Sequence, residues 1–185
     1  MAVPKVSDDA LIERIAHVFR IHGYEGASIR LLSEATGLER ASLYHRYPGG
    51  KEEMASAVIT WTGNWFRANV IEPLANPSQQ PSARLQDVAR NLKEFYERGS
   101  LPCVLDCMTI GSSDPIRDKV RESLGAWTDA FAGLARETGI GAAESRNRAQ
   151  QAIIEIEGAL VVTRVLNDPK PFLKTLDRLK ETLLH

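Results

Sequence analysis

The feature that most constrains the fold is a glycine turn between two short helical segments. Ser28 is the predicted N-cap of a helix over residues 29–36, because its hydroxyl can accept a hydrogen bond from a free backbone N–H group. Gly37 can adopt the left-handed conformation that ends a helix and opens a tight turn. A second short helix is predicted over residues 39–46. This pattern predicts a helix-turn-helix.

The rest of the chain also has helical periodicity, with apolar residues every three or four positions. The segment LPCVLDCMTIG is too short to assign. The fold class is therefore all-α: an N-terminal three-helix helix-turn-helix domain over residues 1–50, then a larger helical domain over residues 51–185. The other helices are predicted near residues 7–22, 51–72 (ended by Pro73), 82–98 (capped by Ser82), 114–134 (started by Asp114-Pro115), 144–166 and from 171 onward.

Composition excludes several classes of protein. The net charge is −1, and residues 1–52 hold seven basic and seven acidic residues, so a DNA-binding face would depend on where the charges point. The first ten residues lack an apolar run, and no apolar stretch is long enough to span a membrane. Two cysteines four residues apart do not form a secreted disulfide framework. We therefore expect a cytoplasmic location and no membrane partner.

No catalytic or metal site is expected. The four histidines lack metal-ligand spacing, no Ser/His/Asp arrangement stands out, and no glycine-rich phosphate loop is present. The chain is thus predicted to be neither an enzyme nor dependent on a cofactor.

A DNA-binding surface is predicted on the second helix of the motif. Leu38 is expected to plug the core between the two helices, and Leu43 to point back onto them, which leaves polar side chains facing outward. A helix of this kind fits the major groove of double-stranded DNA. Arg40 could pair with a guanine edge or a phosphate, and the small Ala41 would permit close approach. The predicted DNA-binding residues are Ser28, Arg30, Arg40, Ala41, Ser42, Tyr44, His45 and Lys51.

The alternative reading is a plain three-helix packing unit with a polar surface, in which Tyr44 and Tyr47 fill the core. We expect that role for Tyr47 more than for Tyr44.

The segment SIRLLSEATGLERASLYHRYPGGKEEM, residues 28–54, resembles the DNA-binding segment of tetracycline-repressor-like (TetR family) regulators. The core Leu-Tyr-His-x-aromatic-Pro-x-x-Lys-Glu carries the resemblance, which extends over about residues 7–58. It implies a homodimer that binds a palindromic operator and is released by a small molecule. The chain departs from the family pattern at Leu31, Ser33, Thr36 and Glu39.

Aromatic residues on several helices predict a cavity for a small apolar effector. Taken singly, each of these residues is better explained as filling the core, and only the set as a whole favours a cavity. Cys103 and Cys107 are interpreted as buried apolar residues, and a thiol sensor is the lesser alternative. The candidates are Trp61, Trp65, Phe66, Phe95, Cys103, Cys107, Met108, Trp127 and Phe131.

The last two helices are expected to form the homodimer interface, as the resemblance implies, and the long helix 51–72 is the candidate lever for release from DNA. A second function class stays open: a helical small-molecule-binding or adaptor protein that keeps the fold without binding DNA specifically. The predicted interface residues are Ile153, Ile156, Leu160, Leu176 and Leu179.

Overall fold

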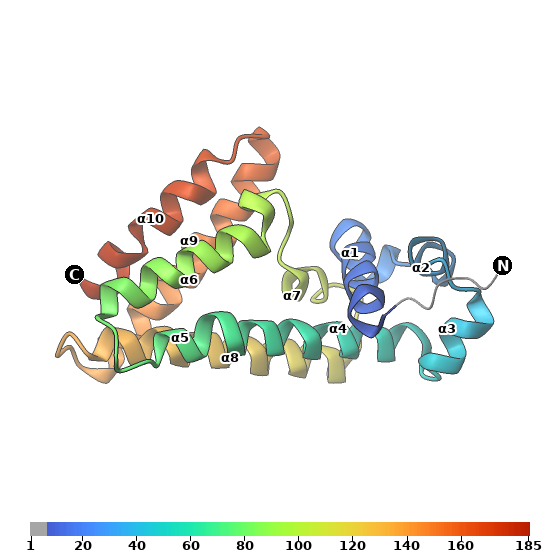
Figure 1. The fold of residues 1–185 in the computed structure, drawn as a ribbon, viewed down its shortest axis with the longest axis horizontal. Helices are drawn as coiled ribbons and strands as arrows, with labels where there is room; N and C mark the ends of the chain where they lie inside the picture. The colour runs from blue at the N-terminus through green and yellow to red at the C-terminus, as the bar shows by residue number, and fades with distance from the viewer. Residues whose placement is uncertain (1–6) are drawn as a thin grey trace. The chain divides into compact units, whose positions relative to one another are not determined.

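The computed structural model describes residues 7–185, and this part of the chain contains only helices and loops (Figure 1). The predicted all-α class is therefore confirmed. The first six residues, on which part of the argument against a signal peptide depends, lie outside the described residues. No helix in residues 7–185 is both long and apolar enough to cross a membrane. The helices are α1 (Asp8–Gly26), α2 (Ile29–Thr36), α3 (Arg40–Arg46), α4 (Gly50–Phe66), α5 (Glu72–Leu74), α6 (Pro81–Phe95), α7 (Val104–Cys107), α8 (Asp114–Arg136), α9 (Ala142–Leu166) and α10 (Lys170–Leu184), with a π-helical turn at Arg67–Ile71 and a 3-10 turn at Glu97–Gly99.

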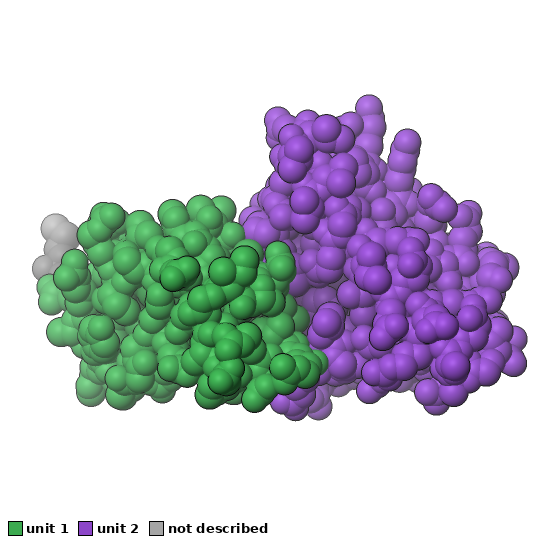
Figure 2. Space-filling model, turned by 180° about the vertical axis from the view of Figure 1, so that it is seen from behind, with its two compact units in different colours: residues 1–63, 104–121 green, residues 64–103, 122–185 purple. Residues whose placement is uncertain are grey.

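The chain divides into two compact units, coloured separately in Figure 2. Unit 1 holds residues 1–63 and 104–121, and unit 2 holds residues 64–103 and 122–185. The domain division expected at residue 50 stays a prediction.

Side-chain caps explain where the first helices begin and end. Ser7 Oγ accepts a hydrogen bond from the N–H of Ala10 at 3.3 Å, which confirms the predicted start of α1. Gly23 has φ 66°, so the helical run is interrupted where the sequence predicted its end. The predicted cap at Ser82 is wrong: α6 begins at Pro81 with Gln80 as N-cap, because a proline fits the first turn, where no N–H partner is needed.

The long helix does not stop at Pro73, as the sequence predicted, but continues to Leu74. A proline inside a helix leaves the carbonyl four residues earlier without its usual partner. Here that carbonyl belongs to Asn69, and it accepts a hydrogen bond from Asn91 Nδ2 of α6 at 2.8 Å. Asn69 Nδ2 in turn donates to the carbonyl of Trp65 at 2.9 Å. The π-helical turn and two asparagine side chains therefore accommodate the proline.

The core of unit 2 includes α6, α9 and α10, and α10 packs against both of the other two helices. Phe172 of α10 is fully buried and contacts the ring of Tyr96, whose centroid lies 5.8 Å away. Leu85, Val88 and Leu92 give α6 its buried stripe.

The buried side chain of Arg84, near the start of α6, connects the C-terminal ends of α5 and α8. Arg84 is 3% exposed and forms a two-pronged ion pair with Glu137, with Nη1–Oε1 and Nη2–Oε2 distances of 2.8 and 2.6 Å. It also donates to the carbonyls of Leu74 at 2.7 Å and Gln79 at 2.9 Å. The hydrogen bond from Arg84 lowers the pKa of Glu137.

Replacing Arg84 with methionine should lower the free energy of unfolding by roughly 2–4 kcal/mol, because the carbonyls of Leu74 and Gln79 lose their partners. Glu137→Gln should reduce the pH dependence. A carboxyl whose pKa is lowered by folding stabilises fully above its ordinary pKa and loses that contribution as the pH falls through the folded value. Urea unfolding between pH 7 and pH 3 measures both effects. Equal loss of stability with acid in wild type and Glu137→Gln would contradict the assignment.

Candidate nucleic-acid interface

The predicted helix-turn-helix is present in unit 1. Ser28 Oγ accepts a hydrogen bond from the N–H of Leu31 at 3.2 Å and caps α2. Gly37 ends α2 with φ 71° and ψ 12°, the left-handed conformation that the turn requires. The N–H of Gly37 donates to the carbonyl of Ser33 at 3.0 Å. The turn therefore has the backbone geometry that its glycine predicted.

Two hydroxyl groups fix the path of the chain through this turn. Ser33 Oγ donates to the carbonyl of Leu38 at 2.6 Å, on the far side of the glycine. Thr36 is fully buried, and its Oγ1 donates to the carbonyl of Leu32 at 2.7 Å. These are two of the positions at which the chain departs from the family pattern. Thr36 Oγ1 also accepts a hydrogen bond from the N–H of Leu38 at 3.4 Å, so both hydroxyls connect α2 to the residue that follows Gly37.

Only one of the two leucines predicted to pack α3 against α2 is fully buried. Leu43 and Leu32 are fully buried and join the two helices. Leu38, expected to plug the core, is only half-buried and lines a surface cavity of about 650 Å3 on the α3 side. Its position directly after Gly37 places it at the edge of the helix pair, so Leu43 and Leu32 carry the packing.

The outward face of α3 carries the predicted polar residues. Tyr44 is 47% exposed, so the alternative that places it in the core is wrong. Tyr47 is half-buried, and burial raises the pKa of its hydroxyl. Glu39 caps α3 without a side-chain hydrogen bond and is exposed. The exposed positions on α3 include Arg40, Ala41, Ser42, Tyr44 and His45.

The flanking candidates have partners within unit 1. Arg30 is exposed and pairs with Glu34 at 2.8 Å, one helical turn along α2. Lys51 Nζ lies 4.6 Å from the ring centroid of Tyr24 and donates to the carbonyl of Glu25 at 3.4 Å. A phosphate contact by Lys51 would therefore compete with its cation–π contact on α1.

Sequence reasoning missed Arg46. This residue forms an ion pair with Asp8 and so connects the end of α3 to the first turn of α1. The two positions are far apart in the sequence, and no local pattern pairs them.

The predicted effector residues are divided between the two units. In unit 2 four rings pack on one another: Phe66 and Trp127 stack at 3.6 Å between centroids, and Trp65 and Phe95 stack at 4.0 Å. Phe131 and Cys103 are buried in the same unit, while Trp61, Cys107 and Met108 belong to unit 1. The thiol of Cys107 donates to the carbonyl of Arg20 at 3.6 Å.

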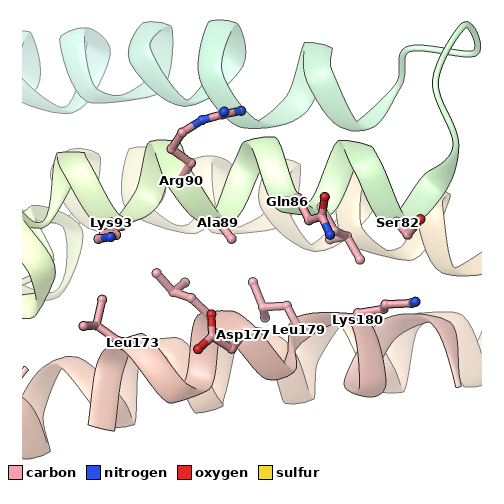
Figure 3. Close-up of a pocket in the computed structure, with 11 residues that line it drawn as sticks. Ser82, Gln86, Ala89, Arg90, Lys93, Leu173, Asp177, Leu179 and Lys180 are labelled. Atoms are coloured by element: carbon pink, nitrogen blue, oxygen red, sulfur yellow. The ribbon is translucent and has the colours of Figure 1, made fainter. Parts of the chain in front are cut away.

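Two surface cavities lie in unit 2, and neither is lined by these rings. A groove of about 440 Å3 between α6 and α10 is lined by Leu85, Leu176 and Leu179 together with polar residues. Figure 3 shows Lys93 of α6 and Asp177 of α10 among these polar residues. The rings of the aromatic cluster pack directly on one another.

The five predicted interface residues lie inside the protomer. Ile153, Ile156, Leu160, Leu176 and Leu179 are all at most 8% exposed, because α9 and α10 turn these stripes toward each other and toward α6. This burial corrects the prediction that these residues of the last two helices form the homodimer interface, because their side chains already pack within one protomer. A second stripe on α9 is the exposed one: Ile154, Val161, Val162, Val165 and Leu166 are 45–77% exposed.

A helix-turn-helix that exposes a polar face on its second helix, followed by a larger helical part, defines the class of DNA-binding transcriptional regulators. Residues 11–58 match the model of the tetR family of bacterial regulatory proteins. Residues 77–178 match the C-terminal domain of LmrA/YxaF-like transcriptional regulators. The chain therefore belongs to the TetR family, as predicted, with an LmrA/YxaF-like C-terminal part. This family consists of regulators and not of enzymes.

Relatives support this placement along most of the chain. The HTH-type transcriptional regulator LmrA of Bacillus subtilis is 24% identical over 173 residues, which cover 90% of this chain and 91% of LmrA. A TetR transcriptional regulator from Legionella pneumophila has the same fold, with a TM-score of 0.85, 17% identity and coverage of 98% and 100% of the two chains. The structure of a CifR cysteine mutant with 26-base-pair operator DNA has a TM-score of 0.72, 21% identity and coverage of 97% and 98%.

Gly37→Ala should destabilise the protein by about 1–2 kcal/mol, because a side chain disfavours the left-handed backbone. A Cβ at Gly37 would meet no atom within 4 Å, so the effect isolates backbone strain. Gly63 lies in the helical interior of α4 with equally open space, so Gly63→Ala should stabilise by about 0.5–1 kcal/mol. Chemical denaturation measures both. A neutral Gly37→Ala would show that the turn tolerates another conformation.

Proposed function

We propose that this regulator is a homodimeric repressor that binds a palindromic operator through α3 and leaves it when a small apolar effector binds. The observation that supports DNA binding is the exposed polar face of α3. Leu43 is buried on the inner side of this helix, while Arg40, Ser42 and Tyr44 are exposed to solvent. It acts on double-stranded DNA, and we expect it to do so in the cytoplasm.

The side chains on α3 divide the work of recognition. Arg40 lies in the first turn of α3, the part of a recognition helix that meets base edges, and its guanidinium can bind a guanine with two hydrogen bonds. Ser42, Tyr44 and His45 can donate to phosphate oxygens. Glu39 directly precedes Arg40 and carries a negative charge, which the DNA phosphates would repel. We therefore expect α3 to bind the duplex with the Glu39 side chain pointing away from the phosphates.

Arg40→Ala and Tyr44→Ala should each weaken operator binding by roughly 1–3 kcal/mol and leave the fold unchanged. Loss of a phosphate contact should also reduce the slope of log K against log salt by about 0.9. Fluorescence anisotropy on operator and random DNA over a salt series measures both quantities.

Arg121 is a suitable control, since it is exposed, pairs with Asp118 and belongs to α8 and not to the helix-turn-helix. Arg121→Ala should retain the affinity of the wild type. Wild-type protein that binds neither DNA at any salt concentration would favour the adaptor reading.

The exposed stripe on α9 is the proposed dimer surface. Ile154, Val161 and Val165 follow one another at helical spacing on one side of the helix. Gly158 lies between them, and a Cβ there would meet no atom of its own protomer within 4 Å. A patch of apolar side chains in water is costly, and a glycine at its centre permits close helix–helix approach. A second copy of the same helix fits both features.

Val165→Lys and Val161→Lys should therefore shift the protein toward monomer in sedimentation velocity at micromolar concentration, because a buried charge replaces an apolar contact. Leu124→Lys is the matched control: Leu124 is also exposed, at 42%, but lies on α8. Unchanged association in both α9 variants would rule out this face.

We propose the aromatic cluster of unit 2 as the point where an effector acts. Phe66 belongs to α4 and Trp127 to α8, and both helices contribute residues to both units. An apolar molecule that inserts between Trp65 of α4 and Phe95 of α6, or between Phe66 and Trp127, must separate stacked rings. Such a change along α4 would favour a conformation less suited to the operator.

A further inference from the structure

A second cavity in unit 2 has properties that the proposed function does not use. It has a volume of about 440 Å3 and lies where the 3-10 turn Glu97–Gly99 meets the corner between α9 and α10. Its wall includes Arg98 and Ser100 from the turn and Arg164, Asn167 and Asp168 from the end of α9 and the loop that follows.

Arg164 is the unusual member of this wall. Its Nη1 is shielded from solvent and has no hydrogen-bond partner among the described residues. The side chain as a whole is half-buried and lines the cavity. A cation that loses water without gaining a partner is costly, and the charge of a guanidinium is shared over all three nitrogens. An anion bound to the accessible side of the group would therefore offset the cost of enclosing Nη1.

The wall around Arg164 is held in an unusual backbone conformation. Glu97, Arg98 and Asn167 have φ values of 46°, 60° and 50°, and they are the only non-glycine residues with positive φ in the described part of the chain. All three line this one cavity. Left-handed backbone is disfavoured at Glu97 and Arg98, whereas asparagine adopts it more readily, so the surrounding packing must enforce the conformation of the turn.

Gly99 shows what enforces the conformation. A Cβ there would lie 2.8 Å from Thr163 Cγ2 and 2.9 Å from Phe172 Cβ, so the turn is pressed directly onto α9 and α10. Thr163 Oγ1 accepts a hydrogen bond from the N–H of Phe172 at 3.1 Å, which ties the two helices together at the same place. The cavity is therefore set by the packing of the backbone and not by a loose surface loop.

The charges around the cavity specify the chemistry of an occupant. Arg98 and Arg164 supply two positive charges, and Glu97 and Asp168 supply two negative charges. Asp168 Oδ1 already accepts a hydrogen bond from the N–H of Lys170 at 3.0 Å. Arginine binds carboxylate and phosphate groups with paired hydrogen bonds, whereas the carboxylates favour hydrogen-bond donors.

We propose that this cavity binds a small molecule that presents an oxyanion, carboxylate or phosphate, to Arg164 and Arg98 and an amino group to Glu97 and Asp168. The site lies apart from the aromatic cluster proposed for the apolar effector, and no residue is shared between them. It does not depend on the proposed dimer or on operator binding.

Thermal unfolding of the full chain, at constant ionic strength, tests the proposal with four probes: inorganic phosphate, phosphoethanolamine, acetate and 4-aminobutyrate. The probes form a phosphate pair (inorganic phosphate and phosphoethanolamine) and a carboxylate pair (acetate and 4-aminobutyrate). Because both groups are oxyanions, at least one pair should raise the melting temperature in proportion to the logarithm of the probe concentration. The pair that acts distinguishes phosphate from carboxylate. Within that pair, the amino-bearing probe should bind more tightly.

Arg164→Met should weaken binding of the active probe roughly tenfold to hundredfold. It should also raise the melting temperature without any probe, because it removes a partly desolvated charge and keeps the volume of the side chain. Arg178→Met is the matched control, since Arg178 is exposed on α10 and pairs with Glu181. It should respond to the probes as the wild type does.

Three results would overturn the proposal. One is a melting temperature that falls in Arg164→Met without probe, which would make the arginine a structural contact. Another is an equal response of wild type, Arg164→Met and Arg178→Met to every probe, which would be a general ionic effect. The third is no response of the wild type to any of the four probes.

Discussion

The orientation of α3 depends on one left-handed residue and two hydroxyl groups. Gly37 reverses the chain after α2, and the hydrogen bond from Ser33 to the carbonyl of Leu38 holds the segment beyond the turn against the helix before it. Thr36 adds a fully buried contact on the same turn. A helix of seven residues has little stability of its own, so α3 takes its orientation from this turn and from Leu43. The exposed face on α3 follows from that orientation.

The helix-turn-helix was largely predictable because its signals are local. A capping serine, a glycine at a positive φ and a proline-glycine stop each act within a few residues, and Ser28, Gly37 and the boundaries of α2 agree with the structure. Long-range contacts gave no such signal. The pairing of Arg46 with Asp8 and the clamp of Arg84 on Glu137 join residues that only the folded chain brings together.

Two errors in unit 2 have related physical causes. A proline usually ends a helix. At Pro73 the helix continues, because the Asn91 side chain of α6 donates a hydrogen bond to the Asn69 carbonyl that the proline leaves without a partner, and no local sequence rule predicts this contact. The helix α9 has apolar residues on two sides, and periodicity alone cannot tell which side faces its own protomer. The structure assigns Ile153, Ile156 and Leu160 to the interior and Ile154, Val161 and Val165 to the surface.

The π-helical turn at Arg67–Ile71 has a consequence for changes in chain length. A π-helical turn accommodates one residue more than the α-helical turn it replaces, and each residue rotates the remainder of a helix by about 100°. Removing one residue here would restore regular α-helical winding and leave the side chains on either side of the turn in nearly the same directions. The turn can therefore absorb a single-residue deletion that would disrupt packing within the preceding helix α4.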